Sequence, residues 1–311
     1  MVVGAGSIGS VVGGFLHLGG HDVHLVGKGP HIEAVIYGGL RIRGIWGEHS
    51  IEGAAASTSV TDSLAAGFAP EWALLSVKSY DTVAALADLA PAFPGLHGIV
   101  SLQNGLGNVE AIGAAAPGLA VGGRVIFGAT TVEPGLVEVT VCADDVLLGP
   151  APGGPEGVEQ VVTAFSESHI PCRYEERILS YIWDKVLYNV CLNALATLLR
   201  TDYGSLGDDS NTWSVMETLV DEFYEVAAAR GVEPVSPTPA DYLARFRGDL
   251  LPPTRLHRSS MQEDIEQGRR TEIDALNGAV WKMGSESGIP TPTNELLTRM
   301  IHFLECSGVS G

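Results

Sequence analysis

Short apolar runs alternate with helical patterns along the first half of the chain. Gly, Pro, Asp or Asn bounds most of the apolar runs, which is typical of buried strands. These runs lie at 1–3, 23–26, 72–77, 98–102 and 121–127. Helical spacing separates several of them, at 7–18, 82–89 and 108–115. This alternation predicts a parallel sheet with right-handed crossovers. Two further segments, 40–53 and 135–150, resemble irregular strands or hairpins around that sheet.

The pattern changes after GPAPGGPEG, a turn-rich stretch at 149–157. One more helix follows it, and beyond Cys172 the strand signals stop. The later apolar periodicity is helical, at 178–199, 214–230, 239–247, 259–267, 271–288 and 294–304. We therefore predict an α/β fold with two domains: a parallel-sheet domain over residues 1–172, then an all-helical domain over residues 173–311.

The glycine-rich start of the chain fits a dinucleotide-binding turn. GAGSIG follows a strand-like lead and opens a helical pattern. In that context Gly4 permits the tight turn, Gly6 lets the backbone approach a pyrophosphate, and Gly9 lets the helix pack on the strand. Ser7 and Ile8 then supply N–H groups at the helix start. A secretory signal is the alternative, but no basic residue precedes Lys28.

Only Met1, Val2 and Val3 precede the first glycine, whereas a strand usually has about five or six residues. Either the start is truncated or this strand is short.

Lys28 bears on which dinucleotide binds. An NAD site usually carries Asp or Glu at the end of the second strand, and here that end reads LVGKGPH. A cation suits the 2′-phosphate of NADP, although arginine would be the stronger bidentate partner. We therefore expect NADP (as NADPH), with NAD as the alternative.

Composition narrows the class of protein further. The net charge of −19 argues against a nucleic-acid surface. No apolar stretch reaches the ~20 residues of a membrane span, so we expect no membrane association and a cytoplasmic location. Four scattered cysteines fit reduced thiols, and their spacing suggests no metal site. Lysine is rare, with only Lys28, Lys78, Lys185 and Lys282, so each position is informative.

A polar stripe runs along one apolar helix in the second half. Lys185, Asn189 and Asn193 recur at i, i+4 and i+8 in WDKVLYNVCLNALATLL, so they share one helical face. Such groups are costly to bury unless they are paired or face a wet pocket. A functional cleft fits best, and a solvated helix face is the alternative.

Other polar groups stand at predicted element ends. Ser260 lies with Ser259 at a helix start, and Glu272 falls in the first turn of a helix that Thr271 would cap. Favourable placement against the helix dipole is the plainer explanation for this glutamate. Lys78 and Asn104 follow predicted parallel strands, where open α/β sheets bind ligands.

Together these residues resemble the ketopantoate reductase (2-dehydropantoate 2-reductase) family. The resemblance spans nearly the whole chain through GAGSIG, VKSYDT, LQNGLGN, WDKVLYN and SSMQEDIEQGRRTEIDALNG. It implies a Rossmann-type N-terminal domain, a helical C-terminal domain, and an active site in the cleft between them. It also implies an enzyme of pantothenate and coenzyme A biosynthesis.

The resemblance also implies roles for residues of the helical domain. Lys185 matches the general acid that hydrogen-bonds the ketone oxygen and protonates it as hydride arrives. Glu272 matches the carboxylate that helps to orient this lysine. Asn189, Asn193 and Ser260 match residues that hold the carboxylate and hydroxyl of the substrate.

In the first domain, Asn104 and Lys78 match groups at the nicotinamide side, with Asn104 expected to contact substrate as well. Lys28 stands where the family often has a ligand for the 2′-phosphate.

The expected activity is NADPH-dependent reduction of 2-dehydropantoate to (R)-pantoate without a metal. One alternative is a paralogue that reduces another 2-oxo acid. A second is a cofactor-sensing protein without catalysis. Such a protein would need none of the residues Lys185, Asn189, Ser260 and Glu272, so their presence together argues against it. The apolar helical domain offers a surface for a homodimer, and the sequence leaves the oligomeric state open.

Overall fold

The computed structural model describes residues 1–307 and divides them into two compact units. The first unit contains Met1–Asn104 and Asn108–Ile178. The second contains Gly105–Gly107 and the chain from Leu179 onward. Strand β12 (Cys172–Tyr174) therefore lies in the first unit, beyond the point where the strand signal was expected to stop. It has only three residues, two of them exposed, so it leaves no apolar run in the sequence.

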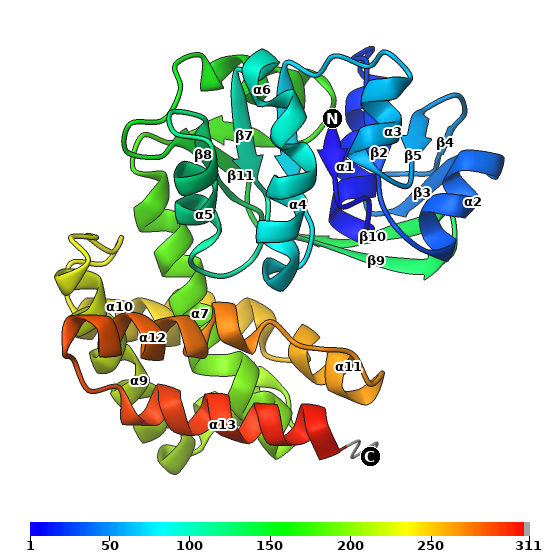
Figure 1. The fold of residues 1–311 in the computed structure, drawn as a ribbon. Helices are drawn as coiled ribbons and strands as arrows, with labels where there is room; N and C mark the ends of the chain where they lie inside the picture. Colours follow the sequence, from blue (N-terminus) through cyan, green and yellow to red (C-terminus); the bar gives the residue numbers. More distant parts are fainter. Residues whose placement is uncertain (308–311) are drawn as a thin grey trace. The chain divides into compact units, whose positions relative to one another are not determined.

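A parallel sheet forms the centre of the first unit (Figure 1). Its spatial order is β5, β2, β1, β6, β7, β8, β11, β12. The strands are β1 (Val2–Val3), β2 (His24–Val26), β5 (Ala55–Ser57), β6 (Trp72–Leu75), β7 (Gly98–Ser101), β8 (Ala120–Arg124) and β11 (Val146–Pro150), with β12 at one edge. All neighbours from β5 to β8 pair in parallel, whereas β11 is antiparallel to β8. The predicted parallel sheet is confirmed.

The strand order places a topological switch point between β1 and β6. From β1 the chain first winds outward through β2 to β5, and then returns to β6 and winds the other way to β8. Right-handed crossovers consequently put the helices of the two halves on opposite faces of the sheet. In such sheets, ligands bind beyond the carboxyl ends of the strands at the switch point.

Helices cover both faces of this sheet. Neighbouring helices α3, α4 and α5 belong to the crossovers on one face, and α1 and α6 lie side by side on the other. Their bounds are α1 (Ser7–Leu18), α3 (Val60–Ala65), α4 (Thr82–Leu89), α5 (Asn108–Ala115) and α6 (Val158–Glu167). Helix α2 (Pro30–Gly38) follows β2. The predicted helices at 7–18, 82–89 and 108–115 have these bounds.

A smaller sheet packs against α1. Its order is β4 (His49–Ile51), β3 (Leu40–Gly44), β10 (Leu136–Cys142) and β9 (Phe127–Glu133). Residues 40–53 form the β3–β4 hairpin, as the sequence suggested. Residues 135–150 instead supply one strand to each sheet, since β10 pairs with β3 and β9 while β11 joins the main sheet.

The second unit is helical throughout the described residues 179–307. Its principal helices are α7 (Ile178–Leu199), α8 (Tyr203–Asp208), α9 (Ser210–Ala229), α10 (Pro239–Arg245), α11 (Ser260–Glu266), α12 (Asn277–Ser287) and α13 (Pro292–Ser307). A single π-helical turn, η3 (Phe246–Leu250), extends α10. Helices α12 and α13 run side by side (Figure 1). Within residues 1–307, no helix combines the length and apolar character needed to cross a membrane.

The helix predicted over 271–288 is wrong in its first turn. A short 3-10 turn, η5 (Ile273–Ala275), comes first, and α12 begins only at Asn277. Leu276 separates them because its φ of −108° and ψ of −107° are not helical. The hydroxyl of Thr271 accepts a hydrogen bond from the N–H of Ile273 at 3.2 Å, so it braces the residue that begins the 3-10 turn and does not cap a long helix.

Candidate cofactor-binding and catalytic residues

The glycine turn after β1 has separate structural demands at Gly4 and Gly9. Gly4 has a φ of +104°, which L side chains rarely adopt, and a Cβ there would lie 2.4 Å from the N atom of Val77. At Gly9 a Cβ would lie 2.3 Å from the carbonyl oxygen of Gly4 and 2.4 Å from Oγ of Ser76. Both positions therefore exclude any side chain, and Gly9 packs α1 directly against the turn.

Gly6 is different, because space in front of it is open. Its φ of −82° suits any residue, and no heavy atom of the described chain would lie within 4 Å of an added Cβ. Gly6 is also the N-cap of α1, and within residues 1–307 no side chain caps this helix. The first N–H groups of α1, including those of Ser7 and Ile8, stand at this open turn and can bind a phosphate. The turn thus fits a pyrophosphate.

A chain of hydrogen bonds through His31 and Ser10 supports the same turn. The N–H of Gly135 donates to Nδ1 of His31 at 3.1 Å, so the neutral ring carries its proton on Nε2. That Nε2 donates to Oγ of Ser10 at 2.9 Å, and Ser10 donates to the carbonyl oxygen of Ala5 at 3.3 Å. Burial lowers the pKa of His31 below its usual 6.5, which keeps the ring neutral.

Lys28 lies just beyond the end of β2 and is exposed. It is followed by Gly29, whose φ of +76° turns the chain into α2. No ion pair to Lys28 occurs among the described residues. The cation thus stands at the carboxyl end of the strand next to β1, where a ribose 2′-phosphate would need a partner.

Lys78 and Asn104 come from two adjacent loops at the same edge of the sheet. Lys78 follows β6 and Asn104 follows β7, and these strands are parallel neighbours. The hydroxyl of Ser79 donates to the carbonyl oxygen of Asn104 at 2.8 Å, which ties the two loops together. The structure therefore brings Lys78 and Asn104 close together beyond the switch point.

A buried polar network holds these loops, and sequence reasoning missed it. Nε2 of Gln103 donates to the carbonyl oxygen of Val77 at 3.0 Å and to the hydroxyl of Thr82 at 2.6 Å. Thr82 donates to Oδ1 of Asn108 at 2.8 Å, and Nδ2 of Asn108 donates to the carbonyl oxygen of Asn104 at 2.9 Å. The three linking residues are at most 8% exposed. The three amide side chains in LQNGLGN are the sequence feature that could have indicated this network.

In the second unit, the polar stripe lies on α7. Lys185 and Asn189 are half-buried and Asn193 is 5% exposed, on a helix whose other side chains are largely buried. The side chain of Asn189 makes no hydrogen bond to any residue in the described part of the chain. A half-buried amide of this kind retains its full capacity to bind a ligand.

Asn193 has a fixed amide. The hydroxyl of Tyr203 donates to its Oδ1 at 2.7 Å. Its carbonyl oxygen accepts from Thr197 at 2.7 Å and from Ser259 at 3.3 Å. Nδ2 of Asn193 makes no hydrogen bond to any residue in the described range 1–307, and it is not fully buried. This nitrogen therefore remains a donor for a ligand.

The two serines at the start of α11 have different positions. Ser259 is fully buried and is the N-cap, because its hydroxyl accepts from the N–H of Gln262 at 3.1 Å. Ser260, the predicted substrate residue, is exposed at the first helical position. The predicted helix start is confirmed, and only Ser260 presents its side chain to solvent.

Glu272 is half-buried and precedes the 3-10 turn η5 as its N-cap residue. It does not stand in the first turn of α12, where the sequence placed it. Within the second unit, the carbonyl oxygen of Glu272 accepts from the N–H of Ala275 at 3.0 Å. The tight turn thus fixes the backbone that carries this carboxylate.

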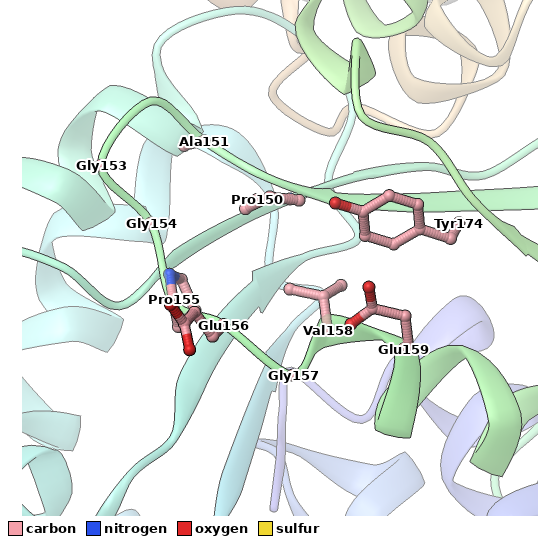
Figure 2. A pocket seen from close by; sticks show the side chains of 10 residues that line it. All are labelled: Pro150, Ala151, Gly153, Gly154, Pro155, Glu156, Gly157, Val158, Glu159 and Tyr174. Atoms are coloured by element: carbon pink, nitrogen blue, oxygen red, sulfur yellow. The ribbon is translucent and has the colours of Figure 1, made fainter.

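Two cavities of the first unit lie away from these residues. One, of about 340 Å³, is formed by the loop after β11, the start of α6 and Tyr174 (Figure 2). The other, of about 520 Å³, lies where the chain enters β1, β2 and β6 and is also lined by α1 and α6. The second cavity thus lies at the amino edge of the parallel strands, opposite the glycine turn. The first lies at the same edge, because β11 is antiparallel to β8 and therefore ends where β8 begins. Within residues 1–307, no group of His, Cys, Asp and Glu could hold a metal ion.

Comparison with known proteins identifies relatives along the whole chain. Residues 1–153 match the family model described as ketopantoate reductase PanE/ApbA, and residues 177–305 match its C-terminal model. The 2-dehydropantoate 2-reductase of Aquifex aeolicus is 36% identical over 309 residues, covering 98% of this chain and 96% of the relative. The enzyme of the same name from Pyrococcus horikoshii is 33% identical over 99% of this chain and 97% of its own.

Solved structures share the fold. A PanE/ApbA family ketopantoate reductase from Ralstonia eutropha has a TM-score of 0.85 at 26% identity, covering 99% of this chain and 98% of that one. D-mandelate dehydrogenase in complex with NADH has a TM-score of 0.84 at 26% identity and covers 98% of both chains. Both halves of the sequence, together with the strand order and the helical second unit, lead to one conclusion: the chain belongs to the ketopantoate reductase PanE/ApbA family.

Proposed function

We propose that this protein reduces 2-dehydropantoate to (R)-pantoate with NADPH. The observation that carries the proposal is the stripe on α7, in which Lys185, Asn189 and Asn193 interrupt an otherwise largely buried helix. Retention of a cation and two amides there is costly without a ligand or partners. The curated relatives that span the chain are named for this reaction. In this proposal, residues 1–172 hold the cofactor and residues 173–311 carry the substrate and catalytic groups.

The first unit fits the cofactor. Gly6 leaves room for the pyrophosphate, with Ser7 and Ile8 offering N–H groups, and Lys28 is available to a 2′-phosphate. Lys78 and Asn104 hold the nicotinamide side from the loops after β6 and β7. When bound, NADPH supplies the hydride. A lysine instead of an acid after β2 favours NADPH over NADH.

Lys185 acts as the general acid. Negative charge develops on the ketone oxygen as the 2-oxo carbon is reduced, and a positioned ammonium stabilises that charge and donates the proton. Glu272 orients the ammonium, and its negative charge favours the protonated form. These roles require no metal ion.

Asn189, Asn193 and Ser260 recognise the substrate. The free amide of Asn189 and the Nδ2 of Asn193 can donate to the carboxylate, and the exposed hydroxyl of Ser260 can donate to or accept from the substrate hydroxyl. A site built around a substrate hydroxyl rejects the analogue that lacks it, because polar groups of the protein are then left unpaired.

The decisive experiment is a substrate panel assayed by the loss of NADPH absorbance. We expect kcat/KM for 2-dehydropantoate to exceed that for 2-oxoisovalerate, which lacks the hydroxyl, by at least about 100-fold. Because D-mandelate dehydrogenase shares the fold, the panel includes benzoylformate, the 2-oxo acid that corresponds to mandelate. A preference for either of these other acids would refute the assigned substrate and leave the reductase chemistry in place.

The catalytic assignment is tested by comparing two lysines of the second unit. Lys185→Ala should lower kcat/KM by at least about 100-fold, the usual scale of general acid catalysis, without changing the Kd of NADPH. Lys282→Ala is the matched control, because Lys282 is exposed on α12 and lies outside the stripe. Near-normal turnover of Lys185→Ala would show that Lys185 is not the acid.

A further inference from the structure

Tyr203 lies at the start of α8 and contacts the polar stripe through one hydrogen bond. Its side chain is 3% exposed, and its hydroxyl donates to Oδ1 of Asn193 at 2.7 Å. Burial raises the pKa of Tyr203 above its usual value of 10, so the hydroxyl keeps its proton. Tyr203 is therefore a constant donor toward this amide.

This hydrogen bond decides which end of the Asn193 amide faces outward. If the amide rotated by half a turn, Nδ2 would donate to the tyrosine oxygen, and the tyrosine proton would need another acceptor. Within residues 1–307 the Tyr203 hydroxyl has no second polar partner. The rings next to it are those of His257, with a centroid distance of 5.2 Å, and Tyr188, at 6.0 Å, and neither of them forms a hydrogen bond with this hydroxyl. A buried hydroxyl proton without an acceptor is costly, so the observed orientation is favoured.

Tyr203 is itself held firmly. Its N–H donates to the carbonyl oxygen of His257 at 3.3 Å, and the N–H of Gly204 donates to that of Arg255 at 2.8 Å. Asp202 caps α8 by accepting from the N–H of Ser205 at 2.8 Å. Because backbone bonds fix both sides of the tyrosine, its hydroxyl can impose an orientation on the amide.

We propose that Tyr203 is a positioning residue that presents the NH₂ group of Asn193 to the substrate carboxylate. The inference rests on the proposed function, which places Asn193 at the substrate. The opposite orientation would direct the carbonyl oxygen of the amide toward the anion and repel it. Tyr203 and Asn193 together therefore favour a substrate with an acceptor oxygen, preferably a charged one, next to Nδ2 of Asn193.

The test is Tyr203→Phe, which keeps the ring and removes the hydroxyl. We expect KM for the best 2-oxo acid to rise about tenfold, since a charge-assisted hydrogen bond is weakened, while kcat changes less than about threefold and the Kd of NADPH is unchanged. Tyr188→Phe is the matched control. Tyr188 belongs to the same ring cluster, but its hydroxyl contacts Oγ1 of Thr254 at 2.5 Å, so its loss should leave KM within about twofold.

A double-mutant cycle separates positioning from a general structural effect. In an Asn193→Ala background, Tyr203→Phe should have no further effect on KM, because the amide through which it acts is gone. An equal rise of KM in both backgrounds, or an unchanged KM in the single variant, would overturn the proposal.

A wild-type protein that binds NADPH but reduces none of the acids would refute the proposed function instead. In that case the side-chain ¹⁵N–¹H resonances of Asn193 decide the question directly. A shift of these resonances in Tyr203→Phe, but not in Tyr188→Phe, supports the positioning role, and unchanged resonances overturn it.

Discussion

Gly6→Ala separates cofactor binding from folding at the glycine turn. Alanine adopts the φ of −82° without strain, and its Cβ would meet no atom of the described residues within 4 Å. Replacing glycine by alanine at an unstrained site stabilises by about 0.4–1 kcal/mol. Glycine is the better N-cap, which offsets part of that gain. The free energy of unfolding should therefore change by less than about 1 kcal/mol.

The added methyl group would, however, occupy the space into which the pyrophosphate must come. Loss of one charge-assisted hydrogen bond from a backbone N–H costs about 1.5–3 kcal/mol. The Kd of NADPH, measured by the fluorescence of the bound nucleotide, should consequently rise by roughly 10- to 100-fold.

Two further alanine substitutions serve as controls. Gly38→Ala, at the end of α2, also enters open space and should leave both Kd and Tm near the wild type. Gly9→Ala would place Cβ 2.3 Å from the carbonyl oxygen of Gly4 and should lower Tm clearly. Wild-type NADPH affinity in Gly6→Ala would refute the approach of the backbone to the phosphates. A fall in Tm comparable to that of Gly9→Ala would show that the methyl group at position 6 clashes within the folded chain.

Four other outcomes are expected. Lys28→Ala should weaken NADPH about tenfold or more in a fluorescence titration and leave NADH nearly unchanged, and equal weakening of both would reject the 2′-phosphate contact. Thr82→Val removes the hydroxyl between Gln103 and Asn108 and should cost about 1–2 kcal/mol in urea unfolding, with Thr82→Ser close to the wild type. The hydroxyl of Tyr242 is buried without a partner in residues 1–307, so Tyr242→Phe should raise the free energy of unfolding by about 1 kcal/mol; no gain in urea unfolding would reveal a bound water. The pKa of His31 is lower in the folded state than its usual 6.5, so the unfolded state binds more protons below about pH 6.5 and stability falls as the pH drops there. Tm should therefore fall less with acid in His31→Gln than in the wild type, and parallel profiles would contradict this.

Local patterns in the sequence determined most of the elements. The turn from β1 to α1 was recognisable because the glycines, the apolar lead and the helical spacing all lie within one short stretch. The stripe of Lys185, Asn189 and Asn193 was visible for a similar reason, since residues four apart share a helix face whatever the rest of the chain does. The fold class followed from the alternation of strand and helix in one half and its absence in the other.

Which strands pair with one another was decided only by the tertiary structure. The sequence predicted irregular strands or hairpins over residues 135–150 but not that β10 and β11 belong to different sheets, because strand pairing depends on which edges are available. Periodicity also continued through Leu276, where the backbone breaks the helix that the apolar spacing predicted.

Hydrogen bonds between distant groups were equally hidden from the sequence. The sequence identified Asn193 as a candidate substrate residue, but it could not show that Tyr203 donates a hydrogen bond to its amide. Nor could it show that Ser259 is buried while Ser260 is exposed. Thr82, Gln103 and Asn108 form their network only because β6 and β7 are neighbours. Sequence periodicity specifies which face of an element is polar, whereas the partner of each polar group is set by the packing of elements far apart in the chain.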